Sequence, residues 1–440
     1  MTLSKYQIYK GSGVEWIGDI PETWGLKRVS WLFQLVGSGT TPPSDVGRFY
    51  GDGTPWVTTG ELREGVIDMT AKSVTPLALS TFPALRVYDP GTILIAMYGA
   101  TIGRLSLLGI PACTNQACCA MSKPRNVIPK FAFFALLGAR THIVELAVGG
   151  GQPNINQETI RSLRLPTPPE NEQRMIASYL DAQTAKIDTL IGKQEQLIET
   201  LTERRQAVIS HAVTKGLDPN VPMKDSRVDR VGDVPGHWEV GNIRRFASMR
   251  TGHTPSRSNP EYWIDCDIPW FTLADVWQLR KGQRYLGETN GTISELGLAN
   301  SAADLLPAGT VVLSRTASVG FTGIMPVAMA TSQDYWNWVC RPELDPTYLW
   351  FQFHAMRPHF ASLVQGSTHK TIYQTDAAAL KITAPPINEQ REIVDYLDQE
   401  TAKIDALSAK AREMIEIFKE RRQALISAAV TGKIDVRGLS

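Results

Sequence analysis

The sequence predicts an α+β protein that arose by internal duplication. It would contain two similar mixed α/β domains and two long helices paired as an antiparallel coiled coil, related by a pseudo-two-fold axis. The main observation is that residues 168–190 and 385–407 match at 16 of 23 positions at an offset of 217. Shorter motifs recur in the same order at similar offsets. A chain of 440 residues is also too long for a single ordinary core.

The two arms, residues 1–166 and 217–384, share a frame of short β-rich runs broken by Gly and Pro. The paired motifs are "VEWIGDIPETW" with "VDRVGDVPGHW", "PWVTTGEL" with "PWFTLADV", "GTILIAMYGATIG" with "GTVVLSRTASVG", and "TNQ" with "TSQ". Late in each arm a helical pattern follows, at residues 131–146 and 347–364. Four tryptophans recur in register and are expected in the cores: Trp24, Trp56, Trp238 and Trp270.

Two spacer helices are predicted at residues 167–216 and 385–433, which leaves residues 434–440 as a tail. Each has a Pro-Pro pair at its start and a glycine at its end, as helices commonly do. Apolar residues seven apart form one seam along each helix, which is typical of a coiled coil. The seam residues are Leu180, Ile187, Leu201, Val208, Leu397, Ile404, Phe418 and Leu425. The chain order favours antiparallel pairing, in a rod of roughly 65–70 Å at 1.5 Å per residue.

The composition is that of ordinary globular domains, with 43% apolar and 20% charged residues. The formal net charge is only +1, so nucleic-acid binding would depend on local basic patches. Five cysteines include no CxxC pair, which favours reduced thiols in a cytosol. The first residues, "MTLSKYQIYKGSG", contain no apolar signal region, and we expect a cytoplasmic protein.

The motifs of several enzyme classes are missing from the sequence. There is no Asn-Pro-Pro or Asp-Pro-Pro tripeptide of a DNA methyltransferase, and no GxSxG or HExxH. The stretch "VGSGTTPPS" has neither GxGxxG spacing nor a Walker GK[ST]. His354 and His359 are five apart, which does not place two metal ligands on one helical face. We therefore expect no catalytic residue, cofactor or metal in this chain.

The motif "GDIPETW", the "PW" strand and the doubled "PPxNEQ" helix followed by "ERRQA" resemble the specificity subunit of type I restriction-modification systems. The resemblance covers nearly the whole chain. It implies that each arm is a target recognition domain that reads one half of an asymmetric bipartite DNA site. It also implies that the coiled coil sets the gap between the half-sites and binds two modification (methyltransferase) subunits. Restriction subunits, which carry the motor and nuclease, would join through these. S-adenosylmethionine, ATP and Mg are then expected on the partner subunits, and no membrane is involved.

Three segments recur in both arms and carry side chains suited to phosphates and base edges. They are residues 37–50 with 250–263, residues 96–104 with 314–322, and residues 149–157 with 366–374. The candidate DNA contacts are Thr40, Thr41, Arg48, Tyr98, Arg104, Gln152, Asn154, His253, Arg257, Arg315, His369 and Lys370.

Two other functions compete with a DNA-recognition subunit. One is a methyltransferase with fused specificity arms, although its cofactor and catalytic motifs are missing. The other is an adaptor whose arms bind proteins and whose coiled coil joins two chains. Any single glycine-rich segment also fits an ordinary turn with exposed polar tips.

Overall fold

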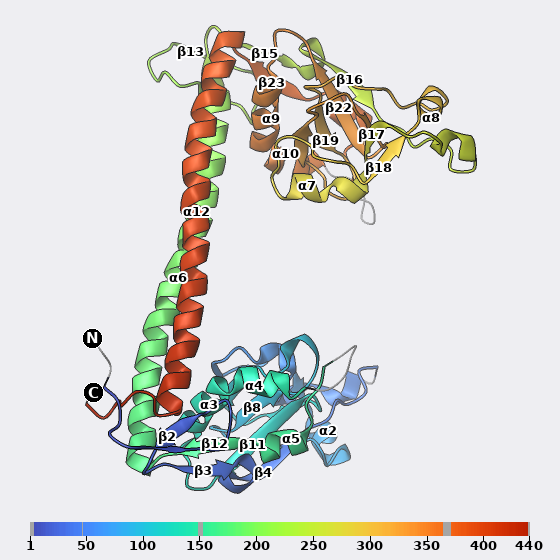
Figure 1. Cartoon of the computed structure of the whole chain (residues 1–440). Coiled ribbons are helices and arrows are strands. Elements are labelled where there is room, and N and C mark those ends of the chain that lie inside the picture. The colour runs from blue at the N-terminus through green and yellow to red at the C-terminus, as the bar shows by residue number, and fades with distance from the viewer. Residues whose placement is uncertain (1–3, 46, 148–152, 364–370, 439–440) are drawn as a thin grey trace. The chain divides into compact units, whose positions relative to one another are not determined.

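The computed structural model describes residues 4–45, 47–147, 153–363 and 371–438 (Figure 1). The chain divides into two compact units. Unit 1 comprises residues Met1–Glu195 and Glu413–Ser440, and unit 2 comprises Gln196–Arg412. Each unit combines one arm with part of each long helix, so the compact units cut the chain differently from the five predicted segments. The reason is that helix ends pack into the arm cores.

The arm of unit 1 is built on a five-stranded sheet in the order β4-β11-β8-β9-β6, with a three-stranded sheet β10-β5-β7 beside it. Neighbours from β4 to β9 are antiparallel, whereas β6 is parallel to β9. The strands of the two sheets are β4 (Phe33–Ser38), β5 (Tyr50–Val57), β6 (Val66–Ile67), β7 (Ser73–Val74), β8 (Ile93–Ala96), β9 (Leu105–Leu108), β10 (Cys113–Thr114) and β11 (Cys118–Pro124).

Short ribbons and helices complete unit 1. The ribbons pair β1 (Tyr9–Gly11) with β2 (Asp19–Pro21) and β3 (Gly25–Arg28) with β12 (Arg164–Thr167). The helices are α1 (Val29–Leu32), α2 (Pro76–Thr81), α3 (Pro129–Gly138), α4 (Arg140–Glu145), α5 (Gln157–Ser162), and the 3-10 turns η1 (Gly47–Phe49), η2 (Thr59–Glu61) and η3 (Gly99–Thr101). Helix α3 is buried along most of its length, because nearly all of its residues after the first turn are apolar.

The arm of unit 2 repeats this plan with a four-stranded sheet, β16-β22-β19-β20, and a three-stranded sheet, β18-β17-β21. The strands are β16 (Ala247–Thr251), β17 (Ile268–Phe271), β18 (Gly291–Ile293), β19 (Val311–Ser314), β20 (Thr322–Ile324), β21 (Ala330–Thr331) and β22 (Tyr335–Cys340), with ribbons β13 (Met223–Asp225) with β14 (Asp233–Pro235) and β15 (Glu239–Asn242) with β23 (Lys381–Ala384).

The helices of this arm are α7 (Trp277–Arg280), α8 (Glu295–Ala299), α9 (Pro346–Ala355), α10 (Arg357–Leu363) and α11 (Gln374–Ala378), with 3-10 turns η4 (Ile243–Arg245), η5 (Pro260–Trp263) and η6 (Leu273–Asp275). Helices α9 and α10 correspond to α3 and α4 of the first arm. The predicted α+β fold class is therefore confirmed in both arms.

The two long helices are α6 (Glu170–Lys215) and α12 (Ile387–Val430). In unit 1 the early part of α6, with Ile176 and Leu180, packs in one core with Ile426 and Val430 near the end of α12. Unit 2 has the converse arrangement, in which the end of α6 shares a core with the early part of α12. Within each unit the helices are therefore antiparallel, as predicted (Figure 1).

Burial along the helices departs from a strict seven-residue repeat. Leu180, Ile187 and Leu201 are buried on α6, but Val208 is only half-buried and Ile209 is buried instead. On α12, Leu397 and Ile404 are buried, Phe418 and Leu425 are half-buried, and Ile426 is buried. A straight helix drifts about 20° per heptad from a seven-residue repeat. The last turns also pack on an arm core, so the buried stripe shifts by one residue there.

The repeated Asn-Glu-Gln motif joins each helix to its arm. Glu172 is buried and accepts hydrogen bonds from Trp24 Nε1 at 2.9 Å and Tyr6 Oη at 3.0 Å. Its counterpart Glu389 accepts one from Trp238 Nε1 at 2.9 Å. The next residue is a glutamine in both copies, and Gln173 accepts from Ile128 N at 2.8 Å, just before α3. The motif therefore has a structural role, and charge-assisted bonds of this kind contribute about 1.5–3 kcal/mol each.

The four repeated tryptophans lie in the cores, as the sequence predicts. Trp24, Trp56, Trp238 and Trp270 are buried. All five thiols are free, and three of them are buried. Burial raises the pKa of Cys113 to about 12, which keeps that thiol protonated. In the part of the chain that the structure describes, no helix has the length and apolar character needed to span a membrane.

Both ends of the chain belong to unit 1. Asp435 N donates to Ser4 O at 2.8 Å, and Tyr9 Oη donates to Gly432 O at 3.0 Å. The segment after α12 thus packs against the first strand of the first arm.

Candidate nucleic-acid interface

The first predicted loop of each arm is fixed by the glutamine of the "TNQ" or "TSQ" motif. Thr41 Oγ1 donates to Gln116 Oε1 at 2.6 Å in unit 1. Thr254 Oγ1 donates to Gln333 Oε1 at 2.8 Å in unit 2. Because the same pair of residue types meets in both arms, the two loops have a common anchor although their sequences differ.

A glycine lets each of these loops cross a neighbouring strand. A Cβ atom on Gly39 would lie 1.7 Å from Thr114 O, and one on Gly252 would lie 2.0 Å from Thr331 O. No side chain fits at such distances, so the backbones approach closely only because both positions are glycine. The loop starts at the end of β4 or β16 and leaves the sheet at a fixed place.

The second and third predicted segments meet in both arms. In unit 1, Tyr98 and Asn154 form an isolated β-bridge. In unit 2, Thr316 and Thr371 form the equivalent bridge, and Ile372 N donates to Arg315 O at 3.0 Å. Segments more than fifty residues apart are thus brought to one place in each arm.

The candidate side chains differ in exposure. Thr41, Arg48, Tyr98, Arg104, His253 and Arg257 are exposed, and Thr40, Asn154 and Arg315 are half-buried. Gln152, His369 and Lys370 lie outside the described residues. Two of the exposed arginines rest on aromatic rings, with Arg48 Cζ 5.2 Å from the Phe49 ring centre and Arg257 Cζ 5.9 Å from that of Trp263. These contacts hold a guanidinium at the surface, where it can reach a phosphate or a guanine edge.

Arg315 lies differently from the other candidates. Its Cζ is 4.3 Å from the Trp336 ring centre, and its Nε is buried without a hydrogen-bond partner among the described residues. Burial lowers the pKa of the Arg315 guanidinium, and Asp334 acts in the opposite direction. Its backbone carbonyl accepts from Thr371 Oγ1 at 3.1 Å. Arg315 therefore helps to position the third segment through its backbone carbonyl.

A basic recess in unit 2 was missed by sequence reasoning. It has a volume of about 470 Å³ and is lined by Arg244, Arg250 and Arg341, with Asp304 4.0 Å from Arg250 Nε. The arginines converge because β16 pairs with β22, which brings residues almost a hundred positions apart together. Only a prediction that β16 pairs with β22 could have revealed the recess, because no single sequence motif contains all of its arginines.

Side chains that could bind a metal are scattered in the described part of the chain. No group of three or more His, Cys, Asp or Glu side chains is placed to hold a metal there. His354 and His359 lie on different helices, α9 and α10. Burial, aided by nearby arginines, lowers the pKa of His354 well below its usual range. Hydrogen-bonding and cationic loops on rigid sheets suit binding of a polyanion.

The chain resembles known proteins over almost its full length. The type I restriction enzyme EcoKI specificity subunit of Escherichia coli (strain K12) is 22% identical, covering 95% of this chain and 90% of its own. The MjaVIII specificity subunit of Methanocaldococcus jannaschii is 21% identical, covering 96% and 95%.

Two solved structures share the fold. A chain from work on complex assembly and conformational transition of the type I R-M system has a TM-score of 0.71 at 17% identity, covering 93% of this chain and 98% of that one. The HsdS subunit from Thermoanaerobacter tengcongensis has a TM-score of 0.51 at 17% identity, covering 94% and 98%.

The family model of the type I restriction modification DNA specificity domain matches this chain twice, at residues 21–200 and 235–416. Each match contains most of one arm and the first part of the helix that follows it. Because the two matches span most of the chain, the protein belongs to the type I restriction modification DNA specificity family.

Proposed function

We propose that this chain reads an asymmetric bipartite DNA site, one half per arm, and directs partner methyltransferase and endonuclease subunits to that site. A role in DNA sequence specificity follows from the family, and the chain is its non-catalytic component. The observation that carries the proposal is the contrast between arms and helices. The helix motif matches at 16 of 23 positions, whereas the loops on the common frame differ in sequence and charge.

The anchored loops support separate readout by each arm. Both arms fix the first loop through a Thr–Gln pair and join the second and third segments by a bridge. On this common frame, unit 1 presents Arg48, Tyr98 and Arg104, whereas unit 2 presents His253 and Arg257. Different donors on equivalent loops are suited to different base sequences.

The helices support binding of the same partner twice. Leu190 on α6 is 41% exposed, and its repeat-related counterpart Leu407 on α12 is 52% exposed. In unit 1, Leu190 lines a groove of about 730 Å³ together with Tyr179, Ile187 and Phe418. We propose that a methyltransferase subunit binds at this surface and another at its repeat, and that S-adenosylmethionine, ATP and Mg act on partner subunits.

An arm exchange tests the division of labour. Residues 1–166 are replaced by those of a relative with a different target, and the hybrid is expressed with its methyltransferase subunit. Sequencing that detects methylated bases should give a site in which one half is new and the other is unchanged. A change in both halves, or methylation that does not depend on this chain, would contradict the proposal.

A second test concerns the gap between half-sites. One heptad added at matched positions of α6 and α12 lengthens each helix by about 10 Å, or about 3 base pairs of DNA. The non-specific gap should grow accordingly. A heptad added to α6 alone serves as the control, because it disrupts the pairing, and an unchanged gap in the matched variant would contradict the spacer role.

A further inference from the structure

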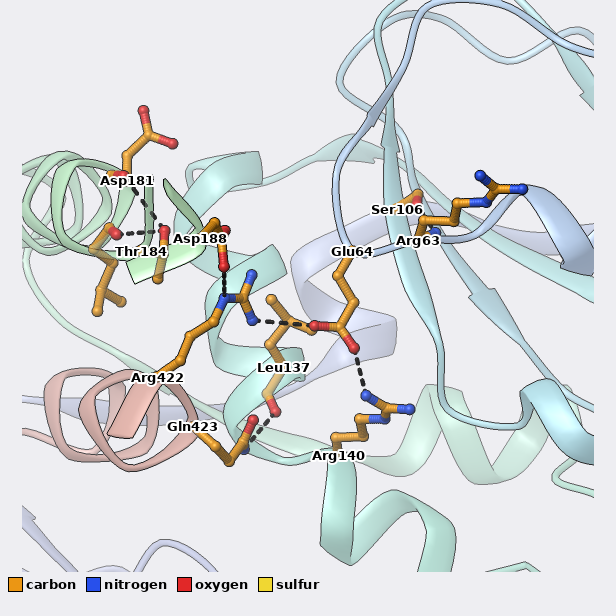
Figure 2. Close-up of polar contacts among 11 residues, drawn as sticks. Arg63, Glu64, Ser106, Leu137, Arg140, Asp181, Thr184, Asp188, Arg422 and Gln423 are labelled. Carbon is orange, nitrogen blue, oxygen red and sulfur yellow. Dashed lines mark hydrogen bonds and ion pairs between the residues drawn. The ribbon is translucent and has the colours of Figure 1, made fainter. Parts of the chain in front are cut away.

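Unit 1 contains a carboxylate between two arginines, here called the Glu64 bridge (Figure 2). Arg422 Nη1 of α12 lies 3.1 Å from Glu64 Oε2, and Arg140 of α4 donates to Glu64 Oε1. Arg422 Nε also lies 3.0 Å from Asp188 Oδ1 on α6. Glu64 N donates to Leu105 O at 2.8 Å, which fixes the backbone of the loop that carries the carboxylate. Two cations thus share two carboxylates.

Most of this arrangement recurs in unit 2 at the repeat offset of 217. Arg205 forms an ion pair with Asp405, as Arg422 does with Asp188. Gln206 Nε2 donates to His354 O at 3.3 Å, as Gln423 Nε2 does to Leu137 O at 3.1 Å. Arg357, at the start of α10, occupies the sequence position of Arg140.

The carboxylate between the arginines does not recur. Strand pairing places Gln283 at the position of Glu64, because Ile324 N donates to the carbonyl of the next residue, Arg284, as the equivalent Leu107 N does to that of Gly65. Gln283 carries no charge, and the amide of the nearby Gln278 is engaged, because its Oε1 accepts from Gly287 N at 2.7 Å and its Nε2 donates to Glu288 O at 2.8 Å. Arg357 forms no ion pair within the described part of unit 2, and its Nε is buried without an acceptor there.

Among the described residues, the surroundings of Arg357 supply no substitute for the carboxylate. His354 is only 7% exposed, and its Nε2 has no partner among the described residues. Arg284 is close enough to lower the pKa of His354, but Asp398 holds it through Nη1 at 2.9 Å. An aromatic ring also lies beside the guanidinium, with Arg357 Cζ 5.0 Å from the centre of Phe321. The cluster therefore carries one more positive charge than its counterpart in unit 1.

We propose that Arg357, Arg205 and His354 form a binding site for a carboxylate supplied from outside the chain. The first arm demonstrates the chemistry, because it places its own carboxylate between the equivalent arginines. Buried cations and polar atoms without partners are costly, so a ligand that neutralises them binds with a favourable free energy. The ligand is a small carboxylate in solution or an acidic side chain of a bound protein. These groups are buried or half-buried, and a stiff duplex cannot bring a phosphate among them.

Thermal unfolding of the full chain tests this site. Sodium acetate replaces sodium chloride at constant ionic strength and pH 7, and we expect a saturable rise in Tm of about 2–4 °C. Arg357→Gln should abolish the rise and Arg357→Lys should keep part of it. Arg140→Gln in unit 1 is the matched control and should keep the full rise. Circular dichroism in chloride verifies that each variant is folded.

Two further measurements identify the source of the carboxylate. Adding the methyltransferase subunit should remove the acetate effect if a protein side chain occupies the site, and Arg357→Gln should then weaken that complex about tenfold. A persistent acetate effect points to a free anion. The proposal fails if acetate raises the Tm of Arg357→Gln as much as that of wild type. It also fails if a DNA duplex abolishes the effect and Arg357→Gln weakens DNA binding, because the site would then bind phosphate. Neither failure affects the methylation test of the proposed function.

Discussion

Units 1 and 2 share their frame and differ in the charges placed on it. Both have a glycine where a loop crosses a strand, an indole bonded to a helix glutamate, and an arginine–aspartate pair between the helices. Only unit 1 adds Glu64 to that pair, and only unit 2 buries a histidine, His354, beside it. The shared features depend on shape and cannot vary freely. The differing ones lie where an arm meets the long helices of its own unit, with Glu64 partly exposed and His354 buried.

The largest effect is expected from the shared tryptophans. Trp24→Ala should destabilise unit 1, and Trp238→Ala unit 2, by about 3–5 kcal/mol each, because each leaves a large cavity. Trp24→Phe retains most of the side-chain volume, so its loss of stability mainly measures the missing hydrogen bond to Glu172. Hydrogen exchange followed by mass spectrometry, with peptides from each unit, measures the effect. Equal loosening of both units by one substitution would show that they do not fold separately.

The crossing glycines should come next. Gly39→Ala and Gly252→Ala each force a Cβ into a backbone carbonyl, and we expect a loss of about 3 kcal/mol together with displacement of the loop that we propose to contact DNA. Gly47→Ala in the same loop of unit 1 has open space around its Cβ and is the control. Denaturant unfolding and DNA affinity are the measurements. A crossing-glycine variant as stable as Gly47→Ala would contradict the close approach.

The third-largest effect is a pH dependence of the free energy of unfolding, which we expect in unit 2 and not in unit 1. His354 is held neutral in the folded state by burial, which lowers its pKa, whereas the unfolded chain binds a proton below about pH 6.5. Stability is therefore lost as the pH falls below 6.5 towards the lowered folded pKa, by at most about 2 kcal/mol at pH 5. Unit 1 has Leu137 at this position and lacks the effect. His354→Leu should remove most of the loss of stability measured between pH 7 and pH 5. We assign the remaining loss to His359, because burial also lowers the pKa of that side chain.

The smallest effect is expected at the Glu64 bridge. Glu64→Gln leaves Arg140 and Arg422 without their shared carboxylate and should cost about 1 kcal/mol, because the side chains are partly exposed. Glu158→Gln removes an exposed pair in the same arm and should cost nothing measurable. Urea unfolding of the two variants side by side distinguishes these values. Equal stability of the two would mean that the bridge is worth no more than a surface pair.

Sequence reasoning succeeded where a pattern repeats along the chain. The duplication, both helices and the core tryptophans each have a local signal that a regular period or a matching motif reveals. The shift of burial from Val208 to Ile209 has no such signal, because it depends on the arm core against which the helix end packs. The Glu64 bridge and the recess around Arg341 arise from contacts between segments that are distant in sequence. No period exists there from which to predict them.

The division of the chain between the units also sets the order in which they can fold during synthesis. Unit 2 is one continuous stretch, Gln196–Arg412, whereas unit 1 needs both Met1–Glu195 and Glu413–Ser440. Domains fold as units while the ribosome adds residues from the N-terminus. The arm that is made first must therefore wait, with the apolar side of its helix uncovered, until the last residues of the chain emerge. The arm that is made second can finish before it. A ribosome that stalls shortly before the end would leave unit 2 complete and unit 1 exposed to proteases.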